Sequence, residues 1–165
     1  MAEALYPAEV EVRLWKALED TKVGMLGVAS ETPRLQPMTA FCDPKGNLIW
    51  FFASRGADLT HLIGDGAAGV FSVVSEDHEM HACLTGDLTT RFDRDVIDRY
   101  WNSTVSAWYP KGKDDPDLVL LAFRPDHAEV WISKRGPVKF GWEVAKSKLT
   151  GTRPEWGQHA RLHLH

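Results

Sequence analysis

Short apolar runs separated by turn-forming residues dominate this sequence and constrain its fold. The runs cover residues 23–29, 37–42, 48–53, 68–74, 80–88, 118–124 and 127–132. The segments between them, such as Glu31-Thr-Pro33 and Asp43-Pro-Lys-Gly-Asn47, contain proline, which presets φ, and glycine and asparagine, which tolerate positive φ. Runs of this length and spacing are typical of strands in an antiparallel sheet. We expect the last two runs to form a hairpin around Pro125-Asp126.

Helical spacing marks three further segments, at residues 9–19, 54–66 and 93–101. The first is amphipathic, with Val10, Leu14, Trp15 and Leu18 on one face. Asp93 can cap the third, because its carboxylate can accept hydrogen bonds from the free backbone amides of the first turn. With so few helices among so many strands, the chain is predicted to be mainly β with peripheral helices, an antiparallel barrel rather than a doubly wound α/β sheet.

Length and charge narrow the class of protein. A chain of 165 residues suits a single domain covering 1–165, in which residues 136–165 form a C-terminal tail that could run extended. A net charge of −4 argues against nucleic acid and anionic membranes as partners. No apolar run approaches the ~20 residues of a membrane span, and residues 1–10 carry no basic segment, so we expect a cytoplasmic protein.

One motif resembles a dinucleotide-binding loop. Gly64-Asp-Gly66-Ala-Ala-Gly69 fits the pattern G-x-G-x-x-G. A dinucleotide loop must leave a strand and open a helix, so that the helix N-terminus faces the pyrophosphate. Here a helix is expected before the motif and a strand after it, which favours a helix stop followed by a turn.

Two histidine clusters raise the question of a metal site. His78, His81 and Cys83 are close in sequence, but only His81 and Cys83 share a face of a strand. The second cluster, His159, His163 and His165, lies at the C-terminal end, where disorder is the default. We therefore expect no metal site. The only two cysteines, Cys42 and Cys83, are expected to be buried thiols rather than a disulfide.

Consecutive aromatic residues give the strongest hint of a ligand. Trp50-Phe51-Phe52 presents large rings to both faces of a strand. One face is expected to belong to the core, whereas the other needs a flat ligand or a second subunit to cover it. A core and dimer interface without a ligand is the alternative.

Several segments of the sequence resemble one family. They are Gln36-Pro-Met-Thr39, Asp43-x-x-Gly46-x-Leu48-x-Trp50-Phe-Phe52, Gly86-Asp87, Trp108-Tyr-Pro-Lys-Gly112-x-Asp114-Asp-Pro-Asp-Leu118 and Ala128-Glu-Val-Trp131. In order and spacing they resemble the general stress protein 26 group of the pyridoxamine 5'-phosphate oxidase-like split barrels. The resemblance implies a six- to seven-stranded antiparallel split β-barrel, a homodimer, and two FMN sites in clefts between the subunits.

The resemblance also implies which residues bind the cofactor. The segment from Gln36 is expected to contact the FMN phosphate and ribityl chain, and the segment from Trp50 to line the flavin ring. Trp108 and Trp131 are expected to close the cleft, either from the same subunit or from its partner. The candidate cofactor-binding residues are Gln36, Pro37, Met38, Thr39, Trp50, Phe51, Phe52, Ala53, Ser54, Arg55, Asp58, Trp108 and Trp131.

Three of these positions depart from the family pattern. Gln36 replaces an arginine, Ala53 a threonine and Asp58 a lysine, which removes two positive charges and adds a negative one. Arg55 could compensate by turning its guanidinium toward the phosphate. The open alternatives are FMN binding, another planar cofactor such as a deazaflavin of the F420 type or haem, and a non-catalytic dimeric module that has lost FMN.

The function expected from the residues and the resemblance together is that of a small FMN-dependent oxidoreductase or flavin-binding stress protein. No catalytic residue is assigned, since a bound flavin would carry the chemistry itself. Oxidation of vitamin B6 is not expected, because no cations that could hold a substrate phosphate are recognisable.

Overall fold

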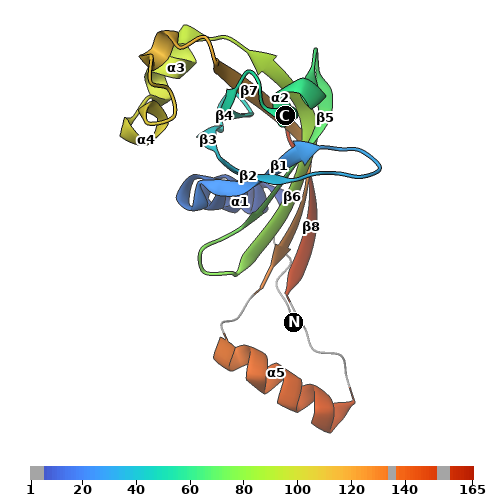
Figure 1. Cartoon of the computed structure of the whole chain (residues 1–165). Coiled ribbons are helices and arrows are strands. Elements are labelled where there is room, and N and C mark those ends of the chain that lie inside the picture. Colours follow the sequence, from blue (N-terminus) through green and yellow to red (C-terminus); the bar gives the residue numbers. More distant parts are fainter. Residues whose placement is uncertain (1–5, 134–136, 152–156) are drawn as a thin grey trace.

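The computed structural model describes residues 6–133, 137–151 and 157–165 (Figure 1). The elements follow in the order α1 (Pro7–Thr21), β1 (Val23–Val28), β2 (Gln36–Thr39), β3 (Phe41–Asp43), β4 (Leu48–Ser54), α2 (Asp58–Ile63), β5 (Ala67–Val74), β6 (Met80–Arg91), α3 (Arg94–Tyr100), α4 (Ser103–Ser106), the 3-10 turn η1 (Gly112–Asp114), β7 (Leu118–Ile132), α5 (Pro137–Thr150) and β8 (Gln158–His163). The strands form one antiparallel sheet in the order β2-β1-β5-β6-β7-β4-β3, with β8 paired to β7. The sheet curls into a half-barrel, which confirms the predicted split barrel (Figure 1).

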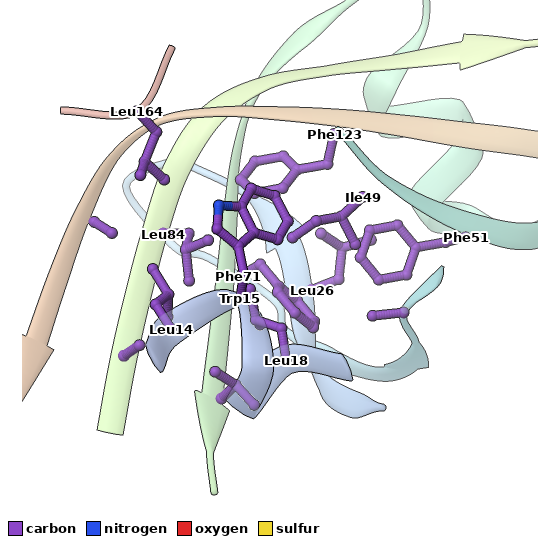
Figure 2. Close-up of a cluster of buried hydrophobic side chains, with 14 of the residues drawn as sticks. Leu14, Trp15, Leu18, Leu26, Ile49, Phe51, Phe71, Leu84, Phe123 and Leu164 are labelled. Atoms are coloured by element: carbon purple, nitrogen blue, oxygen red, sulfur yellow. The ribbon is translucent and has the colours of Figure 1, made fainter. Parts of the chain in front are cut away.

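Helix α1 fills the concave side of the curled sheet (Figure 1). Its buried residues are the four of the predicted apolar face: Val10, Leu14, Trp15 and Leu18. Figure 2 shows Leu14, Trp15 and Leu18 among large side chains of the strands, including Phe51, Phe71 and Phe123. The amphipathic helix and the strand residues that face it therefore make the main core.

A second core lies on the other face of β4 and β7. Leu48 and Trp50 of β4 pack there against side chains of α3, α4 and the following loop, namely Val96, Ile97, Val105 and Tyr109. Asp93 caps α3 as predicted, because its side chain accepts a hydrogen bond from the backbone amide of Val96. The face that was expected to need a ligand or a second subunit is thus covered largely by this chain's own helices.

Strand β7 corrects the predicted last hairpin. Residues 118–132 form one strand of 15 residues, and the expected turn at Pro125-Asp126 is wrong. Thr85 pairs with His127 but Gly86 pairs with Pro125, so Asp126 is an extra residue opposite β6, which makes a β-bulge. A Cβ at Gly86 would overlap the Arg124 carbonyl oxygen and lie 2.7 Å from the Cα of Pro125. Only glycine fits opposite this bulge.

The C-terminal segment also differs from its prediction. It contains helix α5, which lies beyond the ends of β7 and β8 in Figure 1, and strand β8. Expected disorder at the second histidine cluster is wrong, since His159 and His163 belong to β8 and pair with Trp131 and His127. Backbone pairing with β7 orders this segment.

The Gly64–Gly69 motif has the predicted structure of a helix stop and turn. Helix α2 ends at Ile63, Gly64 has a φ of 52° that suits glycine, and β5 begins at Ala67. The order is helix, turn, strand, which is the reverse of a dinucleotide-binding loop. In the part of the chain that the structure describes, no helix is both long and apolar enough to cross a membrane.

Candidate functional site

A pocket of about 850 Å³ lies where the end of α1, strands β2 and β3, the end of β4 and the α3–α4 segment meet. This volume is typical of sites for small organic molecules and cofactors. The lining residues are Glu19, Lys22, Val23, Gln36, Pro37, Met38, Thr39, Ala40, Phe41, Cys42, Phe52, Ala53, Ser54, Ala57, Leu59, Tyr100, Asn102, Thr104, Val105, Trp108, Tyr109 and Asp117.

Aromatic rings make up one wall of the pocket. Phe41 and Phe52 meet edge to face with ring centroids 5.4 Å apart, and Phe41 lies 5.3 Å from Tyr100. Tyr109 lies 6.4 Å from Phe52. Trp108 also lines the pocket, although 79% of it is exposed. The wall offers flat apolar surface to a planar ligand.

Two tyrosine hydroxyls fasten this wall to the strands. Tyr109 donates a hydrogen bond of 2.8 Å to the backbone carbonyl of Ala53 at the end of β4. Tyr100 donates one of 3.2 Å to the carbonyl of Cys42 in β3. The segment that carries the rings is therefore held to the barrel at two points, and the shape of the pocket depends on both.

Polar side chains line other parts of the pocket. Gln36 and Thr39 come from β2, Ser54 ends β4, and Asn102 and Thr104 belong to the α3–α4 segment. Asn102 caps α4, since its side-chain oxygen accepts a hydrogen bond of 2.9 Å from the amide of Val105. These hydroxyl and amide groups suit a ligand that carries several hydroxyl or carbonyl groups.

Charge in the pocket is mixed. Glu19 and Asp117 carry carboxylates, and Lys22 is the only cation in the lining among the described residues. Ser54 donates its hydroxyl to both Asp117 oxygens, at 2.7 and 2.8 Å. With Glu19 and Asp117 ionised and Lys22 protonated, these side chains bring a net charge of −1 to the pocket.

Two titratable groups in the pocket stay protonated at neutral pH. Burial, with a smaller contribution from Glu19, raises the pKa of the Cys42 thiol to about 12. Burial and then the nearby Asp117 raise the pKa of the Tyr109 hydroxyl to about 12. Cys42 therefore lacks the thiolate that a nucleophile needs, and Tyr109 remains a hydrogen-bond donor.

The structure brings eight of the thirteen predicted cofactor residues to this pocket. They are Gln36, Pro37, Met38, Thr39, Phe52, Ala53, Ser54 and Trp108. These residues come from three parts of the sequence, β2, the end of β4 and the loop after α4. The segments chosen by resemblance therefore do converge in space.

The other five predicted residues do not line the pocket of their own chain. Trp50 is 2% exposed in the second core, and Phe51 is fully buried in the main core. Arg55 donates from Nε to the carbonyl of Pro116, and Asp58 is the first residue of α2. Trp131 stacks on His159 at 5.0 Å, on the β7–β8 pair. A contribution of Trp131 from a partner subunit stays a prediction.

Some lining residues were missed by the sequence reasoning. Tyr109 and Asp117 lie inside the Trp108–Leu118 motif that carries the family resemblance, so this motif could have indicated that they line the site. Glu19 and Lys22 come after the last apolar residue of the α1 pattern, and nothing in the sequence around them indicated a site. Their approach to β2 depends on the packing of α1 inside the barrel.

Neither histidine cluster forms a metal site in the part of the chain that the structure describes. No group of three or more His, Cys, Asp or Glu side chains is placed there to hold a metal ion. His78 lies in the β5–β6 turn with a φ of 58°, while His81 lies on β6. Cys42 and Cys83 are both free thiols.

An antiparallel half-barrel with a partly aromatic pocket at the end of β4 places the chain in the class of split-barrel proteins. The family model for pyridoxamine 5'-phosphate oxidase-like proteins matches residues 9–155. The chain belongs to this family, as the sequence resemblance predicted.

Solved structures agree with this assignment. A Jannaschia sp. CCS1 protein assigned to general stress protein 26 is 32% identical, with a TM-score of 0.78 over 96% of this chain and 100% of that one. The general stress FMN/FAD binding protein of Xanthomonas citri is 36% identical, with a TM-score of 0.72 over 78% of this chain and 92% of that one. A general stress family protein of Xanthomonas campestris pv. campestris is 37% identical, with a TM-score of 0.73 over 81% and 93%. Among curated proteins, the comparison found no significant match.

Proposed function

We propose that this protein binds FMN in the pocket and acts as a small flavin-dependent oxidoreductase of the general stress protein 26 type. The observation that carries the proposal is the convergence of β2, the end of β4 and Trp108 around one pocket of about 850 Å³. The Xanthomonas citri relative, which is named as an FMN/FAD binding protein, supports it at 36% identity. Location in the cytoplasm is part of the same prediction.

The residues of the pocket fit a flavin. Phe41, Phe52 and Tyr109 offer flat apolar surface to an isoalloxazine ring. Thr39 and Asn102 offer hydroxyl and amide groups to ribityl hydroxyls. A bound flavin supplies electron and hydride transfer.

The chain's own residues orient the ligand and limit the access of water. Tyr109 holds the aromatic wall against β4 through its bond to Ala53. Trp108 lies at the pocket with most of its indole exposed, where a ligand can bury it. Since Cys42 and Tyr109 stay protonated, neither acts as a base or nucleophile, which agrees with chemistry carried by the cofactor.

A second candidate function has one observation in its favour. The net negative charge of the charged lining residues, with Glu19 and Asp117 against Lys22, opposes a phosphate dianion. A dimeric module that binds no FMN would have this property. A planar cofactor with less negative charge would also fit the same aromatic wall.

The test is a titration of the purified protein with FMN, followed by absorbance and by quenching of flavin fluorescence. We expect saturable binding, weakened about tenfold by Trp108→Ala, because an aromatic contact is worth about 0.5–1.5 kcal/mol beyond area burial. Phe92→Ala is the matched control, since Phe92 is also exposed, at 67%, and does not line the pocket. A colourless protein that ignores added FMN would favour the module without a flavin.

A homodimer is the second part of the proposal. The outer face of the sheet exposes Val23, Met25, Val74 and Trp131. Val74 pairs with His81, and His81 pairs with Trp131, so Val74 and Trp131 lie on one face of neighbouring strands. Met25 pairs with Ser72, two residues before Val74, so Met25 and Val23 share that face. Exposed apolar residues gathered on one face are typical of an interface, and Val23 also borders the pocket.

Sedimentation of two variants tests this interface. Val74→Glu places a charge at the centre of the proposed contact, and we expect it to yield monomers. Val12→Glu makes the same change on α1, where Val12 is 71% exposed, and should leave the dimer intact. A wild-type monomer, or dimers of both variants, would exclude this face as the interface.

A further inference from the structure

We infer that Lys22 provides the positive charge that meets an anionic group of the bound ligand. This inference rests on the proposed flavin function. The anionic group is either the phosphate of FMN or the negative charge that a flavin ring acquires on reduction. Lys22 is the only cation in the described lining, and the basic residue favoured from the sequence, Arg55, is absent from it.

The backbone of Lys22 is fixed at the rim of the pocket from two sides. Its amide donates a 3.0 Å hydrogen bond to the carbonyl of Leu18 at the end of α1. Its carbonyl accepts a 2.6 Å bond from the amide of Ala40, which separates β2 from β3 and lines the pocket. Lys22 therefore joins the helix to the β2–β3 junction, so its side chain starts from a defined point beside Ala40.

The ammonium group of Lys22 has no ion-pair partner among the described residues. Two other lysines are engaged, because Lys16 pairs with Asp20 at 2.7 Å and Lys113 pairs with Asp98 at 2.8 Å. Glu19, one helical turn before Lys22, also lines the pocket without forming an ion pair with it at 4.0 Å or less. The charge of Lys22 is thus available to a ligand.

Lys22 also has a backbone conformation that a lysine adopts reluctantly. Its φ is 63°, at a helix end where glycine is the usual residue. Lys22→Gly would relieve this conformation and remove the charge in one step. If the lysine serves a ligand, the glycine variant should be at least as stable as the wild type and should bind the ligand more weakly. If Lys22 only ended α1, the glycine variant would instead bind the ligand as tightly as the wild type does.

The experiment titrates the full-length wild-type protein and its variants with FMN and with riboflavin, which lacks the phosphate. We expect Lys22→Gln to weaken FMN binding about tenfold, in line with the loss of one charge-assisted contact. Lys22→Arg should keep affinity within about threefold, since it keeps the charge. Lys45→Gln is the matched control, because Lys45 lies exposed in the β3–β4 turn, outside the pocket lining.

Riboflavin distinguishes the two sources of negative charge. If Lys22→Gln weakens FMN and leaves riboflavin unchanged, Lys22 meets the phosphate. If the variant lowers the reduction potential of either bound flavin, Lys22 meets the reduced ring. A Lys22→Gln protein with wild-type affinities and potential would overturn the inference while FMN binding stands. A wild type that binds neither flavin would refute the proposed function, and the inference with it.

Discussion

Replacing Tyr109 by phenylalanine should loosen the aromatic wall of the pocket while keeping its rings in place. The Tyr109 hydroxyl donates a 2.8 Å hydrogen bond to the carbonyl of Ala53, and the residue is 6% exposed. The ring itself packs between Phe52 and Trp101, with centroids 6.4 and 6.1 Å away. Phenylalanine preserves these contacts and removes only the link to β4.

The size of the effect follows from the burial of this bond. A hydrogen bond contributes about 0.5–1.5 kcal/mol, and a buried carbonyl left without its donor costs about 1–3 kcal/mol. We therefore expect Tyr109→Phe to lose about 2 kcal/mol of unfolding free energy at neutral pH. For a domain of this size that is a fall in Tm of roughly 4–8 °C.

The same residue predicts an alkaline signature. Burial, with smaller contributions from Asp117 and Asp115, raises the pKa of Tyr109 from its ordinary 10.0 to about 12. A raised pKa in the folded state means that the stabilisation is complete below pH 10 and is lost as the pH rises toward 12. Because phenylalanine does not titrate, the gap between wild type and variant should shrink over this range, by up to about 2 kcal/mol after allowance for solvent around the group.

Urea denaturation of both proteins at neutral pH, pH 10 and pH 12 measures this gap. Tyr6→Phe is the control, since Tyr6 is 73% exposed and its hydroxyl makes no hydrogen bond within the described structure. Every other residue is common to the wild type and Tyr109→Phe, so its contribution cancels in the difference between these two proteins. Equal stability of wild type and Tyr109→Phe at neutral pH, or a gap that stays constant to pH 12, would refute the reasoning.

Three other predictions test the bulge, the thiols and the charge of the pocket. Gly86→Ala should cost more than about 3 kcal/mol by thermal melting, because its Cβ would meet the backbone of Arg124 and Pro125; a loss below 1 kcal/mol would contradict the bulge. Burial raises the pKa of both the Cys42 and Cys83 thiols, so thiol reagents at pH 8 should label the native protein far more slowly than the urea-unfolded protein, and rapid native labelling would contradict this burial. Asp117→Asn keeps an acceptor for the Ser54 hydroxyl and removes a charge, so FMN should bind several-fold more tightly with riboflavin unchanged; an equal gain for both flavins would argue against a charge effect.

The spacing of apolar residues was sufficient to predict most of the strands. It failed at Pro125-Asp126, where pairing with a neighbouring strand decides whether the chain turns or continues. The run at residues 48–53 became β4 (Leu48–Ser54), because alternation and apolar character are properties of the strand itself. Pro125-Asp126 has the composition of a turn and also suits a bulge. Pairing with β6 on both sides of this dipeptide keeps β7 continuous, and no local signal shows that pairing.

The aromatic strand shows a similar limit. Alternation correctly placed the rings of Trp50 and Phe51 on opposite faces of β4. It did not show that α3 and α4 would bury Trp50 in a second core. That burial depends on these helices, which follow β6, packing back against β4. The pocket therefore begins at Phe52, toward the end of the strand where these helices leave space.

The charge of the pocket predicts how much of the binding free energy comes from the phosphate of FMN and how much from the rest of the flavin. The resemblance places cations at two positions that here carry Gln36 and Asp58, and neither replacement offers positive charge. Lys22 restores one positive charge, against the carboxylates of Glu19 and Asp117. Most of the binding free energy should then come from the aromatic wall and from neutral hydrogen bonds.

FMN and riboflavin should consequently bind within about tenfold of each other, because one lysine opposed by two carboxylates gives the phosphate little net gain. Parallel titrations at low and at physiological ionic strength measure the ratio and its response to salt. A pocket in which a strong cationic clamp holds the phosphate would prefer FMN by roughly a hundredfold or more, and this preference would fall as salt screens the contact. That result would mean that cations outside the described lining, for instance from a second subunit, complete the site.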